Sequence, residues 1–514
     1  MSIRALRSSH AIVGAPAGVT PDPSVPTTAP SFAELRDAVV LVEGDRVIAV
    51  AGGVAGDALV AQADEVIELG ESVLLPGLID LEGLVDIDHL LLDSWWGPAH
   101  EARLEWSEEY ARAPREVLTP AERSTLRRYG LVQLILHGIT SAMPISSEVH
   151  GAWAETHDDL LDTARTASEL GIRVFLGPSY RSGVHVTRAD GTPDIYWDEA
   201  KGRAAFADAE RFLDTVEALA DPLVTGVLVP CRVETVTDEL LQRTARLSAE
   251  RGVRVRVHAT QGLDSEIGFL ARDRGTTPLG LLERTGLLSD RLILAHGVYI
   301  DVHPEVHGED RGDLATLAEA GVSIVHCPVT NARYAFHLER LSQYLTAGIN
   351  VALGTDSFPP DLIRAIDTGV QISKAQHRDL GKGLLAEYVE AATLGGASAL
   401  GRSDLGRIAV GAQADIVAFS LADFRTGAID DPLRTLTLAG TGRDAHFSMV
   451  AGRVVMRDGE IPGLNTTQLR AEGQRIFEKL RAAYAERDAL APTHGSDPDQ
   501  LFPPVFPRAE CGGL

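Results

Sequence analysis

The side chains best suited to chemistry in this chain stand at or just beyond the ends of short apolar segments. They are Glu82, His258, Gln261, His296 and Asp356. A polar residue that directly follows a buried strand points into the mouth of a parallel barrel, so residues from different strands can meet there. Two imidazoles and a carboxylate that converge can bind a divalent metal or perform general acid–base catalysis. The set therefore predicts one catalytic or metal-binding pocket.

Eight short apolar runs between residues 72 and 357 have the length of buried strands. They are Val73–Ile79, Thr140–Ile145, Arg173–Gly177, Gly226–Val229, Val253–Val257, Leu292–Ala295, Val322–Cys327 and Asn350–Leu353. Amphipathic helical patterns lie between them, and several end in a glycine, as at Gly171 and Gly252. This alternation predicts an α/β fold, a (β/α)8 TIM barrel over residues 72–404. A doubly wound open sheet is disfavoured, because no glycine-rich dinucleotide fingerprint follows any run.

The flanks of the barrel segment carry a different pattern, in which apolar and polar residues alternate as in half-exposed strands. Residues 37–71 and 405–460 show it, and Gly44-Asp45 has the composition of a two-residue hairpin turn. Neither flank is large enough to form a stable sheet by itself. We therefore expect residues 1–71 and 405–485 to form one composite β-sandwich domain, followed by a C-terminal tail over residues 486–514.

The composition of the 514 residues limits the classes of partner. A formal net charge of −26 argues against nucleic acid and against an anionic membrane surface. The cysteines Cys231, Cys327 and Cys511 are too scattered for a disulfide framework or a cysteine-based zinc site, which suits a reducing compartment. The sequence has neither an apolar run of transmembrane length nor a signal-peptide pattern at its start. We expect a cytoplasmic homodimer that acts on a small-molecule substrate.

Three segments resemble the amidohydrolase superfamily, in particular its chlorohydrolase and aminohydrolase branch, which acts on triazines, guanine and related heterocycles. The lead-in Leu-Pro-Gly-Leu-Ile-Asp that starts at Leu75 is similar to the first barrel strand of that family. The segments Leu405–Val417 and Met449–Arg453 resemble its late strands. The polar strand ends also occur in the order of the family, so the resemblance extends over residues 37–460.

The resemblance implies a role for each strand-end residue. His258 would be a metal ligand, His296 would contact the metal-bound water or the substrate, and Asp356 would bind the metal and act as general base on the attacking water. The family also holds its metal through a His-x-His pair in the first strand, and those positions are Glu82 and Leu84 here. Glu82 can supply a third ligand and His296 a fourth. We expect either one divalent ion, zinc or iron, or a site that works without metal.

A second departure from the family lies three residues after His258. Deaminases of this branch carry a proton-shuttling glutamate there, and this chain carries Gln261. An amide can hydrogen-bond a substrate but cannot carry a proton at neutral pH, which disfavours deamination of purine-type rings by the usual route. The segment after the first strand adds further polar and aromatic residues. They either replace missing ligands and wall the pocket or form an exposed acidic loop: Asp88, His89, Trp95 and Trp96.

We interpret the chain as a hydrolase that uses activated water to attack a non-peptide carbon–nitrogen bond, or a similar bond, of a small, cyclic molecule. The alternative is a metal-free lyase, cyclase or isomerase on the same scaffold, with the residues of the predicted pocket as acids and bases. A third interpretation is a non-catalytic binding protein. The retention of His258, His296 and Asp356 argues against the third, and the loss of the His-x-His pair favours the second. Fold alone does not choose among them.

Overall fold

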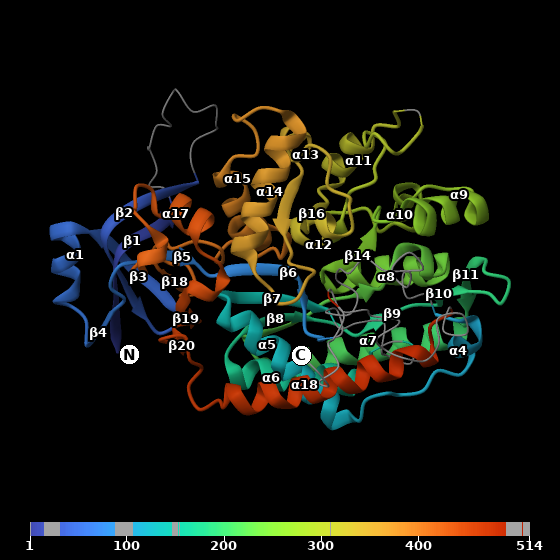
Figure 1. Ribbon diagram of the computed structural model, residues 1–514, viewed down its shortest axis with the longest axis horizontal. Coiled ribbons are helices and arrows are strands. Elements are labelled where there is room, and N and C mark those ends of the chain that lie inside the picture. Colours follow the sequence, from blue (N-terminus) through green and yellow to red (C-terminus); the bar gives the residue numbers. More distant parts are fainter. Residues whose placement is uncertain are drawn as a thin grey trace, which may run out of the picture.

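The computed structural model describes residues 2–14, 31–87, 106–145, 153, 155–308, 310–489 and 506. Five residues considered above lie outside the described residues, namely Asp88, His89, Trp95, Trp96 and Cys511. Most strands belong to two regions, a flanking sheet drawn in blue and orange-red and a barrel-like group of parallel strands beside it (Figure 1). No helix in these described ranges is long and apolar enough to cross a membrane.

The barrel-like group consists of eight parallel strands in two sheets, with the orders β12-β8-β7-β6 and β14-β15-β16-β17. Their bounds are β6 (Leu78–Leu84), β7 (Ile139–Ile145), β8 (Arg173–Leu176), β12 (Val224–Gly226), β14 (Val255–Ala259), β15 (Leu292–His296), β16 (Ser323–His326) and β17 (Asn350–Leu353). Every residue of β6, β14 and β15 is buried, as expected for parallel strands covered on both faces. The predicted α/β architecture with a TIM-barrel-like arrangement is therefore present.

Backbone hydrogen bonds connect the edges of the two parallel sheets. The Leu228 amide donates to the Arg254 carbonyl at 3.0 Å, and the Arg256 amide donates to the Leu228 carbonyl at 2.9 Å, next to β12 and β14. At the other edge, the Asp356 amide, just after β17, donates to the carbonyl of Glu82 in β6 at 2.8 Å. The ends of β6, β14 and β17 are thereby held in fixed relation, which places their side chains around one space.

The first barrel strand differs from the prediction of a single strand over Val73–Ile79. The structure has two strands there, β5 (Ser72–Pro76) in the flanking sheet and β6 in the barrel-like group. They are separated by Gly77, where a Cβ atom would lie only 2.0 Å from the Oγ1 of Thr140. Both strands are buried, so the apolar run is continuous and its periodicity does not reveal the change of sheet. As a result Glu82 lies inside β6 rather than beyond its end.

The flanking sheet is built from both flanks of the chain, in the order β20-β19-β18-β5-β1-β2-β3, with β4 paired to β1. The bounds are β1 (Ile3–Gly14), β2 (Phe32–Glu43), β3 (Arg46–Gly52), β4 (Glu65–Glu68), β18 (Ile416–Ser420), β19 (Ala445–Val450) and β20 (Arg453–Arg457). The predicted hairpin turn is confirmed, since Gly44 has a φ of +60° between β2 and β3. The pairing of β5 with β18 joins the two flanks, and a two-layered sandwich stays a prediction.

Helices follow the predicted alternation. Those expected from the sequence are α5 (Pro120–Leu136), α6 (His157–Leu170), α7 (Glu199–Leu219), α8 (Asp238–Arg251), α11 (Asp313–Ala320) and α13 (Leu341–Thr346). The left-handed residues Gly171, Gly252 and Gly321 end α6, α8 and α11, as predicted for C-terminal glycines. The remaining helices are α1 (Gly53–Val60), α4 (Glu108–Arg112), α9 (Phe269–Arg274), α10 (Pro278–Thr285), α12 (Pro328–Arg333), α14 (Leu362–His377), α15 (Leu385–Glu390), α16 (Gly396–Ala399), α17 (Pro432–Ala439) and α18 (Thr466–Ala483).

The last long helix, α18, packs along the barrel-like group against α5 (Figure 1). The Nζ of Lys479 donates to the Oε2 of Glu122 at 2.7 Å, at the first turn of α5. Four short strands complete the fold: β9 (Ser179–Tyr180), β10 (Gly183–Thr187), β11 (Pro193–Trp197) and β13 (Val229–Pro230). Of these, β10 and β11 form an antiparallel hairpin after β8, in the insertion that precedes α7.

Candidate functional site

Four of the predicted site residues meet at the carboxyl ends of the barrel strands. The Oε2 of Glu82 lies 3.6 Å from the Nε2 of His258, and the ring centroids of His258 and His296 are 5.4 Å apart. The Nε2 of His296 lies 3.7 Å from the Oδ2 of Asp356. The predicted convergence of these side chains is therefore found, at the place where parallel barrels carry their active sites.

Two of these residues have a backbone conformation that is uncommon for side chains other than glycine. His296 has a φ of +70° and Asp356 a φ of +39°. Surrounding contacts hold Asp356 in place, because its amide donates to the Glu82 carbonyl at 2.8 Å and its own carbonyl accepts a hydrogen bond from the Oγ1 of Thr330. Such strained positions cluster at functional sites, where the fold fixes the direction of a side chain.

One side of the site, called here the strand-one side, consists of Asp80, Glu82 and Arg256. Glu82 is fully buried, and the Nε of Arg256 lies 3.6 Å from its Oε1. Neither Glu82 carboxylate oxygen has a hydrogen bond within the described part of the chain. Burial raises the pKa of Glu82 to about 7, with Arg256 acting against the shift and Asp80 adding to it. Glu82 can therefore gain or lose a proton near neutral pH.

Asp80 holds the strand-one side in place through hydrogen bonds to the backbone and to Thr355. Its Oδ1 accepts hydrogen bonds from the amides of Glu82 and Thr355, both at 3.0 Å, and its Oδ2 accepts from the Oγ1 of Thr355 at 2.6 Å. Burial raises the pKa of Asp80, although these hydrogen bonds act in the opposite direction. Because Thr355 directly precedes Asp356, Asp80 sets the separation between the carboxyl groups of Glu82 and Asp356.

Both imidazoles of the site are held in their neutral form. The Nδ1 of His258 donates to the carbonyl of Cys231 at 2.9 Å, which leaves its Nε2 as an acceptor toward Glu82. Burial, followed by His296 and Arg232, places the pKa of His258 well below its usual value. Burial and Arg232 lower the pKa of His296 to about 3. At neutral pH these rings can therefore accept or donate a hydrogen bond, or bind a metal, without carrying a charge.

Gln261, the fifth predicted residue, lies in the loop that follows β14. Its Oε1 is buried and makes no hydrogen bond within the described residues. The loop is held by Glu266, whose carboxylate accepts hydrogen bonds from the amides of Thr260, Gln261 and Gly262. Burial and the nearby Glu234 carboxylate raise the pKa of Glu266 to about 8. Glu266 was not predicted as a site residue, and its hydrogen bonds position the loop that carries Gln261.

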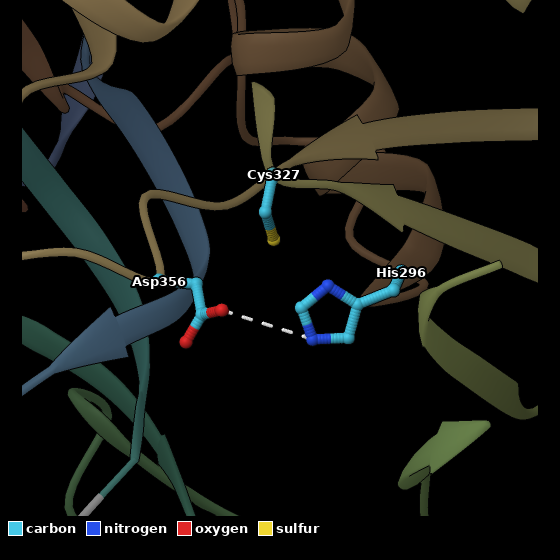
Figure 2. A group of neighbouring side chains, drawn as sticks. All are labelled: His296, Cys327 and Asp356. Carbon is cyan, nitrogen blue, oxygen red and sulfur yellow. Dashed lines mark ion pairs between the residues drawn. The ribbon is translucent and has the colours of Figure 1, made fainter. Parts of the chain in front are cut away.

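The opposite side of the site, called here the strand-eight side, consists of His296, Cys327 and Asp356 (Figure 2). Each offers one ligand atom, and these atoms all lie within 4.8 Å of one another. Among the described residues, this is the one group of three that could hold a metal ion by that criterion. Sequence reasoning missed Cys327 as a site residue and Arg256 as the partner of Glu82. Both stand beside predicted residues, since Cys327 directly follows β16 and Arg256 lies two residues before His258 on the same strand face.

Comparison of the sequence with models of known protein families finds one match. The model of the amidohydrolase family matches residues 73–455. The chain belongs to the amidohydrolase family. This amidohydrolase is therefore an enzyme, and the resemblance found in its sequence is confirmed. Its barrel-like strands carry the candidate site at their carboxyl ends.

The amidohydrolase is similar along most of its length to enzymes that act on small molecules. It is 27% identical over 425 residues to a 5-methylthioadenosine/S-adenosylhomocysteine deaminase of Natronomonas pharaonis, covering 82% of this chain and 90% of the relative. It is 28% identical over 452 residues to an 8-oxoguanine deaminase of Pseudomonas aeruginosa, covering 86% of this chain and 95% of the relative.

Solved structures share the fold of this amidohydrolase. An adenosine deaminase from Xanthomonas campestris with bound zinc aligns with a TM-score of 0.72 at 21% identity, covering 93% of this chain and 98% of that one. The atrazine chlorohydrolase TrzN from Arthrobacter aurescens, complexed with zinc, aligns with a TM-score of 0.73 at 23% identity, covering 92% of this chain and 100% of that one. Both of those proteins hold zinc, and the donor set on the strand-eight side has residue types that zinc accepts.

Proposed function

We propose that this amidohydrolase hydrolyses a non-peptide carbon–nitrogen bond, or a similar bond, of a small, cyclic molecule by attack of activated water. The observation that carries the proposal is the convergence of Glu82, His258, His296 and Asp356 in one buried space, with both imidazoles neutral. The names of the deaminase and chlorohydrolase relatives support a hydrolytic reaction on a small molecule.

Asp356 is the proposed general base. Its side chain is 12% exposed, more than that of His296 or Glu82, so it lies where water can enter the site. It faces the neutral ring of His296, whose nitrogens make no hydrogen bond within the described residues. In the proposed reaction Asp356 takes a proton from the attacking water, while His296 orients that water or the polarised group of the substrate.

Glu82 is the proposed general acid, in place of the glutamate that this chain lacks at Gln261. A pKa of about 7 leaves a large fraction of its carboxyl groups protonated at neutral pH, which suits transfer of a proton to a leaving nitrogen. Gln261 hydrogen-bonds the substrate through its amide and carries no proton. Arg256 stabilises the carboxylate that the proton transfer leaves on Glu82.

A divalent ion bound on the strand-eight side would be held by His296, Cys327 and Asp356, and it would supply Lewis-acid polarisation and a more acidic water. The strand-one side fits such an ion poorly, because Glu82 already faces a guanidinium group there. His258 keeps its Nε2 directed toward Glu82 and helps to hold that carboxyl in place. The acid and base assigned above are residues of the chain itself.

A substrate panel tests the reaction. Cyclic amides, imides and ureides are compared with purine, pyrimidine and triazine amines, and each product is analysed by mass spectrometry in water labelled with the heavy oxygen isotope. Hydrolysis places one labelled oxygen in the product. We expect the ring amines to release little ammonia, because their deamination needs a proton on the ring nitrogen as well as on the leaving group, and Gln261 cannot deliver the first of these. The proposal fails if no compound gains solvent oxygen in an enzyme-dependent way.

The second candidate is a metal-free lyase, cyclase or isomerase. The ion pair of Glu82 with Arg256, in a position where the family carries a metal-binding histidine, favours it. The same labelling experiment separates the two candidates, because a lyase, cyclase or isomerase forms product without oxygen from water. Product formation with no label would therefore replace the hydrolase proposal with this one.

Three further features remain proposals. They are a homodimer in a cytoplasmic location, the division into a sandwich domain over residues 1–71 and 405–485 with a barrel over 72–404, and a separate tail over 486–514. Light scattering of the purified chain measures its oligomeric state. Limited proteolysis followed by mass spectrometry tests the domain bounds, because cleavage concentrates at exposed segments between packed units.

A further inference from the structure

The strand-eight side brings three kinds of donor atom together around one space. His296 and Cys327 are both fully buried, and the ring nitrogens of His296 make no hydrogen bond within the described residues. Figure 2 shows the Cys327 sulfur, the His296 ring and the Asp356 carboxylate turned toward a common space. We propose that these three side chains form a site for one divalent transition-metal ion such as zinc. The ion would lie between strands β15, β16 and β17, away from the position implied by the family resemblance.

The distances suit a tetrahedral ion after small side-chain movements. Zinc binds nitrogen and oxygen at about 2.0–2.2 Å and sulfur at about 2.3 Å, so ligand atoms around it lie roughly 3–4 Å apart. The Nε2 of His296 and the Oδ2 of Asp356 are already 3.7 Å apart. The three donor atoms span at most 4.8 Å, so closure requires movement of about 1 Å. Three protein ligands leave a fourth position open for water or substrate, as in catalytic zinc sites.

Charged side chains of the protein itself occupy the metal position that the family resemblance implies. Glu82 occupies the place of the first histidine of the His-x-His pair, and Arg256 lies 3.6 Å from its carboxylate. Leu84 occupies the place of the second histidine and offers no donor. A dication beside Glu82 would be repelled by the guanidinium group in a buried environment, where charges are weakly screened. The remaining donors therefore favour an ion displaced toward Cys327.

The charges on the strand-eight side balance those of the ion. Binding breaks the S–H bond of Cys327, the thiolate donates its electron pair to the metal, and one proton leaves to solvent. The thiolate and the Asp356 carboxylate together neutralise the two positive charges, while His296 binds in its neutral form. No oxidant or reductant is required.

Cobalt(II) is the probe for this site, because a thiolate ligand gives it a near-ultraviolet charge-transfer band that nitrogen and oxygen ligands do not give. The full-length protein, in a Cys511→Ser background, is stripped with a chelator and titrated with cobalt(II). We expect one ion per chain and a thiolate band that grows with binding. Cys327→Ser should abolish the band and weaken binding by more than about 100-fold, a size that loss of even an outer-shell partner can reach.

Matched variants locate the ion. Cys231→Ser removes the other described cysteine, and His258→Gln removes the histidine implied as ligand by the family, and both should keep the band. His296→Gln retains the thiol and should weaken binding about as much as Cys327→Ser, which provides a second variant should that protein not fold. Absence of stoichiometric binding overturns the proposal. So does binding that survives Cys327→Ser but is lost in His258→Gln.

The inference concerns the same site as the proposed function, yet it is tested by binding and absorption rather than by turnover. A protein with the cobalt band and no hydrolytic product refutes the reaction and leaves the metal site. A protein that turns over substrate without binding cobalt refutes the metal site and leaves the reaction. The two results are therefore distinguishable in one set of purified variants.

Discussion

The strand-one side and the strand-eight side both carry ionisable side chains at the same end of the barrel strands, but they differ in how the charges of those side chains are met. On the strand-one side, the Glu82 carboxylate faces Arg256, and Asp80 accepts three hydrogen bonds from neighbouring groups. On the strand-eight side, His296 makes no hydrogen bond within the described residues, and the donor atoms face one another. The protein's own side chains therefore meet the charge on the strand-one side, whereas the strand-eight side gathers three candidate metal donors.

The largest effect is expected from Asp356→Asn, which keeps the shape of the side chain and removes its charge. Turnover of the substrate found in the panel should fall about 100-fold or more, the usual contribution of a general base. The unfolding midpoint should change little. Asp430→Asn, at an exposed position, is the control and should retain the normal rate. A normal rate in Asp356→Asn would remove the catalytic role from the strand-eight side.

Arg256→Met should mainly affect stability, because it leaves Glu82 buried without its ion-pair partner. We expect the free energy of unfolding to fall by about 3 kcal/mol, the range seen when one partner of a buried pair is removed. Urea denaturation measures the change. The double variant Glu82→Gln/Arg256→Met should recover part of the loss, because no charge is then left unpaired. Equal losses in the single and double variants would show that the pair is not the stabilising unit.

The pH profile should report the protonation of Glu82. Its carboxyl must be protonated to act as the acid, so turnover should be high below a pH of about 7 and fall about tenfold per pH unit above it. The pKa of Glu82 is raised by burial, so the transition lies well above that of an exposed glutamate. Glu82→Gln should lower the rate and remove this limb of the profile. If the rate of that variant still falls above a pH of about 7, the fall is caused by the titration of a group other than Glu82.

Thr355→Val should have the smallest effect, at the junction of the two sides. It removes the hydrogen bond of 2.6 Å from Thr355 to Asp80 while preserving the volume of the side chain. We expect a loss of about 1–2 kcal/mol in the free energy of unfolding, because a buried acceptor loses one of its donors. Turnover should decline modestly through the altered spacing of Glu82 and Asp356. Thr355→Ser, which keeps the hydroxyl, should behave like the unchanged protein in both measurements.

The sequence was sufficient to predict the alternation of strands and helices and the meeting of Glu82, His258, His296 and Asp356. Each of these residues is polar within or beyond an apolar strand, and parallel strands bring such positions to one end of the sheet. The break at Gly77 was not predictable, because β5 and β6 are both buried and only their pairing partners differ.

The other residues that the sequence did not reveal depend on contacts between segments that are far apart in the chain. Arg256 faces the same way as His258, but its neighbour Glu82 comes from another strand, so no local spacing encodes their contact. Cys327 is indistinguishable from an ordinary core thiol until His296 and Asp356 are placed beside it. Glu266 binds backbone amides of a loop, and such contacts depend on the loop conformation rather than on a motif.

The position of β5 between β1 and β18 has a consequence for the order of events during synthesis. The N-terminal strands leave the ribosome first, but one edge of β5 stays unpaired until residues 416–420 of β18 have been made. An unpaired edge can template pairing with other chains. Because β5 leads directly into β6, which carries Glu82, nascent or truncated chains that end before β18 would lack an anchor for the first barrel strand and be prone to aggregate.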